Sequence, residues 1–126
     1  MVPSAWQARP NAPAAGAPVC RLADLPDDGG FERVFGQGER AFRLVVFRVA
    51  GQVRGYVNEC PHFRVPFNFN PGVFNVYDID GQRDLMCAHH TAMFHLADGF
   101  CYEGPCAGGS LLAVPLRVAG DSVLVA

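Results

Sequence analysis

The sequence predicts an all-β fold in which short antiparallel strands form a β-sandwich, and three observations support this prediction. Of the 126 residues, 50% are hydrophobic and only 17% are charged, which provides enough apolar surface for the modest core of one domain. Fourteen glycines and ten prolines divide the chain into short segments, as in turn-rich β proteins. The apolar runs between them are rich in β-branched and aromatic residues, which favours strands over helices.

The first 18 residues are expected to form a flexible tail, and residues 19–126 to form the folded domain. The tail is rich in alanine and proline, and Trp6 is its one candidate for docking onto the domain. It lacks the regions of a secretion signal and the roughly 20 apolar residues of a membrane span. Because these signals are missing, we expect a cytoplasmic protein. A net charge of −2 and the lack of a basic cluster predict that it binds neither membranes nor nucleic acid.

In the first half of the chain, apolar runs separated by glycine-containing turns predict four strands. An edge strand is expected at residues 19–22 and a short strand at residues 31–35, with a turn at 26–30 between them. The run at 41–50 is dense in valine and phenylalanine and predicts a mostly buried strand. Gly51 and Gln52 close a hairpin onto a strand at 53–58, which leads directly to Cys60.

In the second half, strands are expected at residues 84–86 and 92–94, followed by a closing hairpin of 110–119 and 122–126. The total is about nine short strands. The segment 63–80 is expected to be an extended loop whose aromatic residues fill a satellite core, shield a bound group or face a partner. Those aromatic residues include Phe67, Phe69, Phe74 and Tyr77.

Two short motifs contain the residues best suited to metal binding. They are Cys-Pro-His at positions 60–62 and Cys-Ala-His-His at positions 87–90. Each motif places a soft thiolate beside an imidazole, so two loops together supply two sulfur and two nitrogen ligands. Within one motif the cysteine and histidine are too close in sequence to surround one ion comfortably, but they can reach two adjacent ions.

This spacing favours a [2Fe–2S] cluster, with each loop giving its cysteine to one iron and its histidine to the other. Replacement of two cysteines by two histidines on one iron is the ligation of a Rieske centre. A zinc site made by the same side chains is the alternative. Structural zinc sites, however, usually pair cysteine with cysteine and histidine with histidine, whereas both motifs here are mixed.

With these motifs the sequence resembles the Rieske [2Fe–2S] family, and within it the small soluble Rieske-type ferredoxins, over about residues 19–126. Phe94, Gly99 and the pair Gly104 and Pro105 match the family's usual run after the second motif, where a proline-containing loop covers the cluster. The resemblance implies a β-sandwich with the cluster held by two loops at one end. The segment 63–86 departs from the commonest pattern, because it is several residues longer.

The resemblance also implies which residues bind the cluster, one cluster per chain. The expected ligands are Cys60, His62, Cys87 and His90. His89 competes with His90, because it repeats the Cys-x-His spacing of the first motif, but the family pattern uses the later histidine. His95 is expected to be an ordinary strand residue.

The remaining thiols are expected to be buried structural cysteines. They are Cys20, Cys101 and Cys106. A disulfide between Cys101 and Cys106 is conceivable, although a cytosolic compartment argues against a stable one.

The features that accompany a high reduction potential are missing from the matching positions. High-potential Rieske proteins have a cysteine in each loop that together form a disulfide, a serine after the second histidine and a tyrosine further on. The corresponding residues here are Val65, His89, Ala92 and Phe94. With fewer hydrogen bonds to the cluster sulfurs, their negative charge is less compensated and the oxidised state is favoured. We therefore expect a low potential.

Two classes of function follow from the resemblance. The first is a soluble one-electron carrier similar to the ferredoxins that link a flavin reductase to the terminal oxygenase of ring-hydroxylating dioxygenases. The chain lacks the mononuclear iron site and extra domain of the oxygenase itself, so we expect no catalysis of its own. The second class is a redox or iron-sulfur sensor, or an accessory subunit, whose cluster state controls partner binding.

Overall fold

Three antiparallel sheets make up the part of the chain that the structure describes. The structure is a computed structural model and describes residues 5–27, 29–59, 66, 68, 74–88, 91–105 and 107–126. Eleven strands lie within these residues, and the only helices there are three short 3-10 turns, none long and apolar enough to cross a membrane. The predicted all-β antiparallel fold is confirmed.

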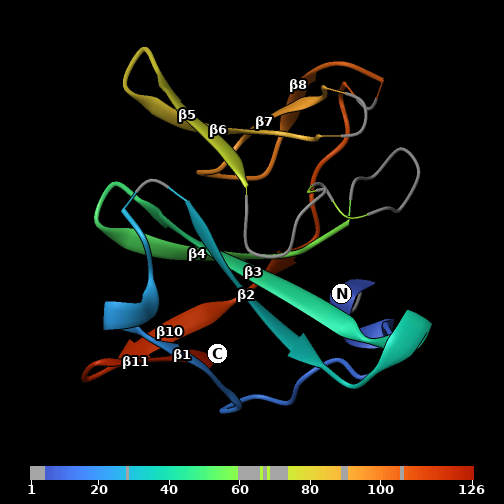
Figure 1. The fold of residues 1–126 in the computed structure, drawn as a ribbon, viewed down its shortest axis with the longest axis vertical. Helices are drawn as coiled ribbons and strands as arrows, with labels where there is room; N and C mark the ends of the chain where they lie inside the picture. Colours follow the sequence, from blue (N-terminus) through green and yellow to red (C-terminus); the bar gives the residue numbers. More distant parts are fainter. Residues whose placement is uncertain are drawn as a thin grey trace.

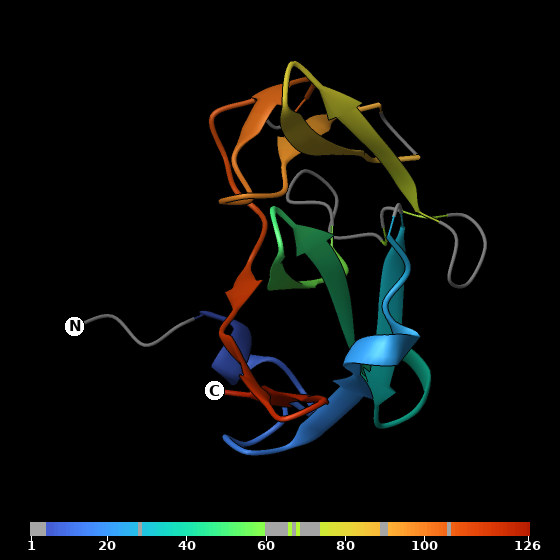
Figure 2. The same cartoon turned by 90° about the vertical axis from the view of Figure 1, so that its left-hand side faces the viewer.

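The sheets form two tiers, which are visible in two views at right angles (Figure 1 and Figure 2). The upper sheet has the order β5-β6-β7-β8, and the lower tier contains one sheet of order β2-β3-β4-β9 and one of order β1-β11-β10. The upper strands are β5 (Asn75–Ile79), β6 (Gln82–Met86), β7 (Met93–His95) and β8 (Cys101–Glu103). The lower strands are β1 (Pro18–Arg21), β2 (Gly30–Phe35), β3 (Phe42–Val49), β4 (Gln52–Val57), β9 (Ala113–Val114), β10 (Leu116–Ala119) and β11 (Ser122–Val125).

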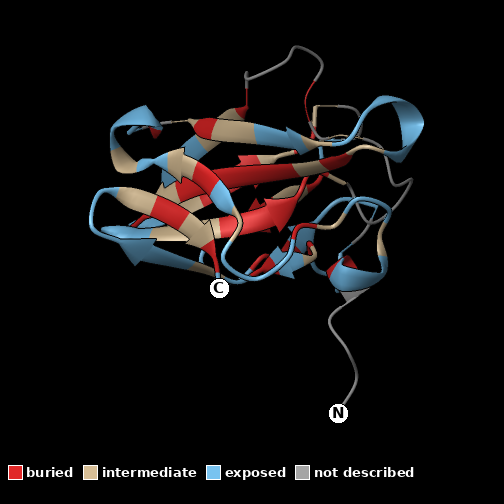
Figure 3. Cartoon of the chain, turned by 90° about the horizontal axis from the view of Figure 1, so that it is seen from below, coloured by how far each residue is buried: buried red, intermediate tan, exposed pale blue. Residues whose placement is uncertain are grey.

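The central strand β3 is buried on both of its faces and separates two hydrophobic cores. Its residues Val45, Phe47 and Val49 belong to the core shared with the upper sheet, which we call the upper core. The alternate residues Phe42, Leu44 and Val46 belong to the lower core. Because successive side chains of a strand point to opposite faces, one eight-residue strand supplies both cores. Figure 3 shows buried residues along the interior strands and exposed residues at the outer turns.

Two hairpins use turns whose geometry the sequence specifies. Ala50 and Gly51 connect β3 to β4 with φ angles of 51° and 77°, and Asp80 and Gly81 connect β5 to β6 with φ angles of 51° and 80°. Positive φ at both central residues matches the right-handed twist of the flanking strands, and glycine adopts it without steric cost. The predicted hairpin that leads toward Cys60 is confirmed, as is the closing hairpin of β10 and β11.

The structure differs from the predicted strands in the second half of the chain. Residues expected to form an extended loop make strand β5, and β8 was not predicted. The expected strand at 110–119 is divided at Pro115, so that β9 pairs with β4 whereas β10 pairs with β11. Proline has no backbone N–H to donate to a ladder, which allows the chain to change sheets at this residue.

The segment before β1 is packed against the lower core through Trp6. This residue lies on the 3-10 turn η1 (Ala5–Ala8), its side chain is 4% exposed, and its ring meets Phe42 edge to face with centroids 6.1 Å apart. Trp6 is therefore docked, where a solvated tail was expected. The other 3-10 turns are η2 (Leu22–Asp24) and η3 (Gly38–Arg40).

Gly30 at the start of β2 leaves space for contact between the two tiers. A Cβ atom at this position would lie 2.7 Å from Cε1 of Phe47 and 2.9 Å from Cδ2 of Phe74. These two rings meet edge to face with centroids 5.7 Å apart. Phe74, which immediately precedes β5, thereby packs on the lower tier because residue 30 has no side chain.

Removal of the Trp6 ring is expected to destabilise the domain. Trp6→Ala should lower the free energy of unfolding by about 3 kcal/mol, the low end for such truncations, because the short 3-10 turn that carries Trp6 lies outside the sheets and can relax into the space. Urea-induced unfolding followed by circular dichroism measures this change. Gln7→Ala, on the same turn at an exposed position, is the matched control and should change stability by less than about 0.5 kcal/mol. Equal effects of the two substitutions would show that the Trp6 packing does not stabilise the domain.

Candidate metal centre

The second motif begins on a tight turn between β6 and β7. The backbone N–H of Cys87 donates to the carbonyl of Ala92 at 2.8 Å, and the N–H of Thr91 donates to the carbonyl of Cys87 at 2.8 Å. Thr91 has a φ of 55°, a conformation that is uncommon for a β-branched residue and needs support from its surroundings. The two backbone bonds provide that support and fix the backbone of Cys87.

The side chain of Cys87 is a buried sulfur donor. It has no exposed surface and belongs to the upper core together with Ala92 and Phe94. A soft sulfur ligand in dry, apolar surroundings suits an iron-sulfur cluster, because the hydrophobic shell limits solvent access. Cys87 therefore fits the role that its sequence motif predicts.

The loop that contains Gly104 and Pro105 packs against this turn. Gly104 has a φ of 103°, and a Cβ atom there would lie only 2.7 Å from the Cα of Ala92. Glycine is therefore required by both conformation and space. The contact agrees with the expected proline-containing loop, and the covering of a cluster by this loop remains a prediction.

Neither Ala92 nor Phe94 can donate a side-chain hydrogen bond to a cluster sulfur. Both side chains are fully buried in the upper core. Positions 92 and 94 are thus occupied by apolar packing, without the hydroxyl groups that accompany a high potential in the family that the motifs resemble. The low potential itself remains a prediction.

The first motif follows directly from β4. The N–H of Asn58 donates to the carbonyl of Arg43 at 2.8 Å, and the N–H of Glu59 donates to that of Val57 at 2.8 Å. The backbone is therefore held to the neighbouring strand β3 up to Asn58, and Glu59 makes a local turn onto Val57. Cys60 itself lies outside the described residues, so its placement stays a prediction. The same holds for four further residues that the motifs single out as ligands, as a competing ligand or as the site of a missing disulfide. They are His62, Val65, His89 and His90.

A polar cluster that the sequence did not reveal lies on the upper sheet. Asp84 is only 2% exposed, accepts a hydrogen bond of 2.7 Å from the hydroxyl of Tyr102 and lies 2.9 Å from Nδ1 of His95. The rings of His95 and Tyr102 stack with centroids 4.2 Å apart. His95 does lie on a strand, as expected. The sequence offered little signal for this cluster, because Asp84 follows the polar residues Gln82 and Arg83 and only then comes an apolar pair.

The hydrogen bond to Asp84 has a direct effect on the ionisation of Tyr102. This bond, with smaller contributions from burial and nearby charge, raises the pKa of Tyr102 to about 12.

Asp84 and His95 have no third acidic, histidine or cysteine partner within the described ranges with which to hold a metal ion.

Two of the remaining thiols lie within the described part of the chain. Cys101 is buried and its Sγ donates to the carbonyl of Glu103 at 3.3 Å. Cys20 is half-buried, and burial raises the pKa of its thiol to about 11, which keeps it protonated and unreactive at neutral pH. Cys106 lies outside the described residues, so its pairing with Cys101 is untested.

Comparison with known proteins identifies the family. Residues 16–117 match the sequence pattern of the Rieske [2Fe-2S] domain. This chain belongs to the Rieske [2Fe-2S] domain family. The cofactor of a Rieske domain is a [2Fe–2S] cluster, which favours iron and sulfide over the zinc alternative. None of the curated proteins compared with the chain matches it in sequence.

Solved structures share the Rieske fold at low sequence identity. The Sphingomonas yanoikuyae B1 ferredoxin is 20% identical, with a TM-score of 0.62 over 87% of this chain and 96% of its own. A chain from the complex of reduced oxygenase and oxidized ferredoxin in carbazole 1,9a-dioxygenase is 24% identical, with a TM-score of 0.61 over 86% and 99%. A Mycobacterium tuberculosis protein assigned as the small subunit of an NADH-dependent nitrite reductase is 20% identical, with a TM-score of 0.63 over 86% and 89%.

Substitution of Cys87 is expected to prevent cluster assembly. Cys87→Ala removes a buried sulfur ligand, so the purified protein should contain little iron or acid-labile sulfide, measured by colorimetric analysis. Cys20→Ala, at the protonated half-buried thiol, is the control and should retain both. Iron and sulfide at wild-type levels in Cys87→Ala would rule out this residue as a ligand.

The Tyr102 interaction is expected to lose its stabilising effect at alkaline pH. Because its pKa is raised from 10.0 to about 12 on folding, the hydrogen bond stabilises the fold fully below pH 10 and loses this contribution as pH rises through 12. The difference in unfolding free energy between wild type and Tyr102→Phe should stay constant up to about pH 10 and then shrink. Urea titrations at several pH values test this, and a constant difference up to pH 12 would contradict it.

Proposed function

We propose that this Rieske protein is a one-electron carrier whose cluster is held by four side chains from two loops. The ligands are Cys60, His62, Cys87 and His90. When bound, a [2Fe–2S] cluster supplies reversible transfer of single electrons. The observation that carries the proposal is the buried Cys87 on a hydrogen-bonded turn, inside a chain that matches the family over residues 16–117.

The residues around the second loop would keep the cluster environment dry and its potential low. Ala92 and Phe94 surround Cys87 with apolar surface, and neither has a hydroxyl group to stabilise added negative charge on the cluster. The Gly104 loop lies against the same turn and limits access of water from that side. These features favour the oxidised state and suit a carrier that passes electrons onward at low potential.

The finer proposal is that the protein is the ferredoxin component of a ring-hydroxylating dioxygenase system. A flavin reductase would then supply its electron and a terminal oxygenase would receive it. The similarity to a ferredoxin and to a ferredoxin–oxygenase complex supports this assignment through the fold. In this role the chain would carry no catalytic residue and would work in the cytoplasm.

An accessory subunit is the second candidate function. The similarity to a protein assigned as a nitrite reductase small subunit favours it. A carrier forms transient complexes and should be recovered alone when a tagged chain is purified from its native cells. A subunit should be recovered in fixed ratio with a larger redox enzyme.

Spectroscopy of the purified protein tests the proposed cluster. We expect about two irons and two sulfides per chain and, after reduction with dithionite, an electron paramagnetic resonance spectrum of Rieske type. The reduction potential should fall in the lower part of the Rieske range of about −150 to +300 mV, because hydroxyl donors are missing. A midpoint above about +150 mV would refute the argument from Ala92 and Phe94, and zinc without sulfide would refute the carrier function.

His89 and His90 can be distinguished in the same spectra. Replacement of the imidazole ligand by a thiolate adds negative charge to the cluster and should lower its potential. His90→Cys is therefore expected to shift the spectrum and lower the potential, whereas His89→Cys should leave both near those of the wild type. The reverse result would assign His89 as the ligand.

A further inference from the structure

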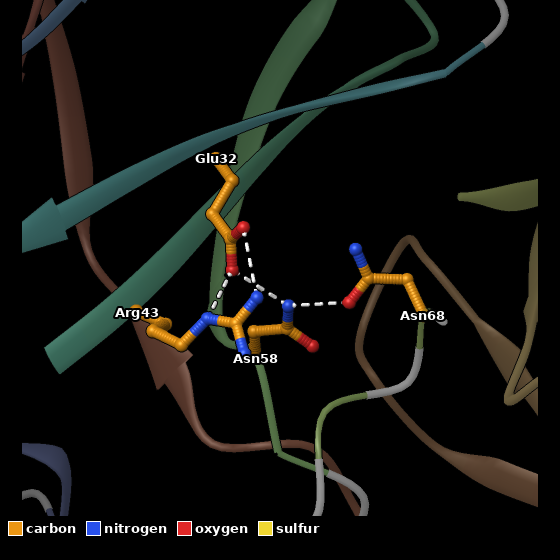
Figure 4. Close-up of polar contacts among 4 residues, drawn as sticks. All are labelled: Glu32, Arg43, Asn58 and Asn68. Atoms are coloured by element: carbon orange, nitrogen blue, oxygen red, sulfur yellow. Dashed lines mark hydrogen bonds and ion pairs between the residues drawn. The ribbon is translucent and has the colours of Figure 1, made fainter. Parts of the chain in front are cut away.

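A buried carboxylate lies next to Asn58, two residues before the first motif. Glu32 on β2 has a side chain that is 8% exposed and forms a two-pronged ion pair with Arg43 on β3, at 2.7 Å to Nε and 3.0 Å to Nη2 (Figure 4). Paired geometry of this kind fixes both side chains, because the planar guanidinium matches the two carboxylate oxygens. The pair joins neighbouring strands in a sheet whose register is regular over six residue pairs.

The same carboxylate holds the residue at which β4 ends. Nδ2 of Asn58 donates to Oε2 of Glu32 at 2.8 Å and also to Oδ1 of Asn68 at 2.9 Å. Both asparagines are buried, with 4% and 6% exposure. A carboxylate accepts hydrogen bonds and cannot donate, so it fixes the orientation of the Asn58 amide, which then presents its second N–H to Asn68.

The network joins residues that lie on either side of the first motif in the sequence. Asn58 and Asn68 are ten residues apart, and Cys60 and His62 lie between them. The Asn58–Asn68 bond therefore closes the base of the segment that contains the first motif, and Glu32 attaches this closure to the sheet. Asn68 belongs to the stretch that departs from the commonest Rieske pattern.

We propose that Glu32, Asn58 and Asn68 are positioning residues that hold the first ligand loop in its cluster-binding geometry. The proposal rests on the proposed roles of Cys60 and His62 as ligands. None of the three residues touches the metal in this account. They limit the separation of the two ends of the loop, so that the ligands are presented without a search through other conformations.

A second contact holds the adjacent residue to the segment before β1. Arg9 donates from Nη2 to Oε1 of Glu59 at 2.8 Å, and both side chains are half-buried. Asn58 is thus held to β2 through Glu32, and Glu59 is held through Arg9 to the segment that follows η1. The Asn58–Asn68 bond is distinct because it alone of these contacts reaches the far side of the motif.

Substitution of Asn68 isolates the loop closure from the ion pair. Asn68→Ala removes the acceptor for Asn58 and leaves Glu32 and Arg43 intact, so the thermal unfolding midpoint of the apoprotein should fall by only a few degrees, the cost of about one buried hydrogen bond. The cluster should be lost to a chelator about fivefold faster, the effect of one net hydrogen bond, as followed by visible absorbance. The electron paramagnetic resonance lines of the remaining cluster should broaden, because the ligand geometry becomes heterogeneous.

Two further variants separate positioning from general stability. Asn68→Gln keeps an amide oxygen as an acceptor for Asn58, without a second buried carboxylate beside Glu32, and should restore most of the cluster lifetime. Asn75→Ala, on β5 and outside this network, is the matched control and should behave as the wild type. Glu32→Gln places an amide among hydrogen-bond donors, and its effect on cluster loss should not add to that of Asn68→Ala, because both act through Asn58.

The outcomes separate this proposal from the carrier function. Cluster loss from Asn68→Ala at the rate of Asn75→Ala, with unchanged line widths, would overturn the positioning role while the carrier function stands. Faster loss that Asn68→Gln does not reverse, accompanied by a fall of more than about 10 °C in the apoprotein unfolding midpoint, would also overturn it. A wild-type protein without iron and sulfide would refute the carrier function and, with it, the ligand roles on which the positioning proposal rests.

Discussion

The burial of strand β3 on both faces is the constraint on which the other elements depend. Three of its residues pack upward with Phe94 and Leu85, and three alternate residues pack downward with the lower sheets. A shift of one residue in its pairing would exchange these two sets. The register with β2 and β4 therefore has to be fixed before either core can form, and the ion pair of Glu32 with Arg43 lies within that register.

The two cysteine–histidine motifs depend on this framework in different ways. The second motif is attached to the upper sheet by the backbone bonds of Cys87, and its cysteine is itself part of the core. The first motif follows a strand of the lower tier, and Asn58, at the end of that strand, is held by side-chain bonds to Glu32 and Asn68. Packing therefore holds the residue at which the second motif begins, whereas polar contacts hold the residues on either side of the first.

The sequence was most informative where local chemistry decides the structure. The hairpin at Ala50 and Gly51 and the paired motifs of cysteine and histidine follow from residue types and short spacings, and they could be predicted. The division of the last strands at Pro115 and the docking of Trp6 depend on which distant strand is available as a partner. The buried Asp84, likewise, has partners on two other strands that no local pattern could identify.

Gly30 shows how a residue can be required by its neighbours without any unusual backbone conformation. Its φ angle is not positive, so a larger residue would be acceptable on conformational grounds, but the rings of Phe47 and Phe74 fill the space beside it. The three positions therefore share one volume. Among related sequences, a side chain at position 30 should occur together with a residue smaller than phenylalanine at position 47 or 74, so these sites should vary as a set and not singly.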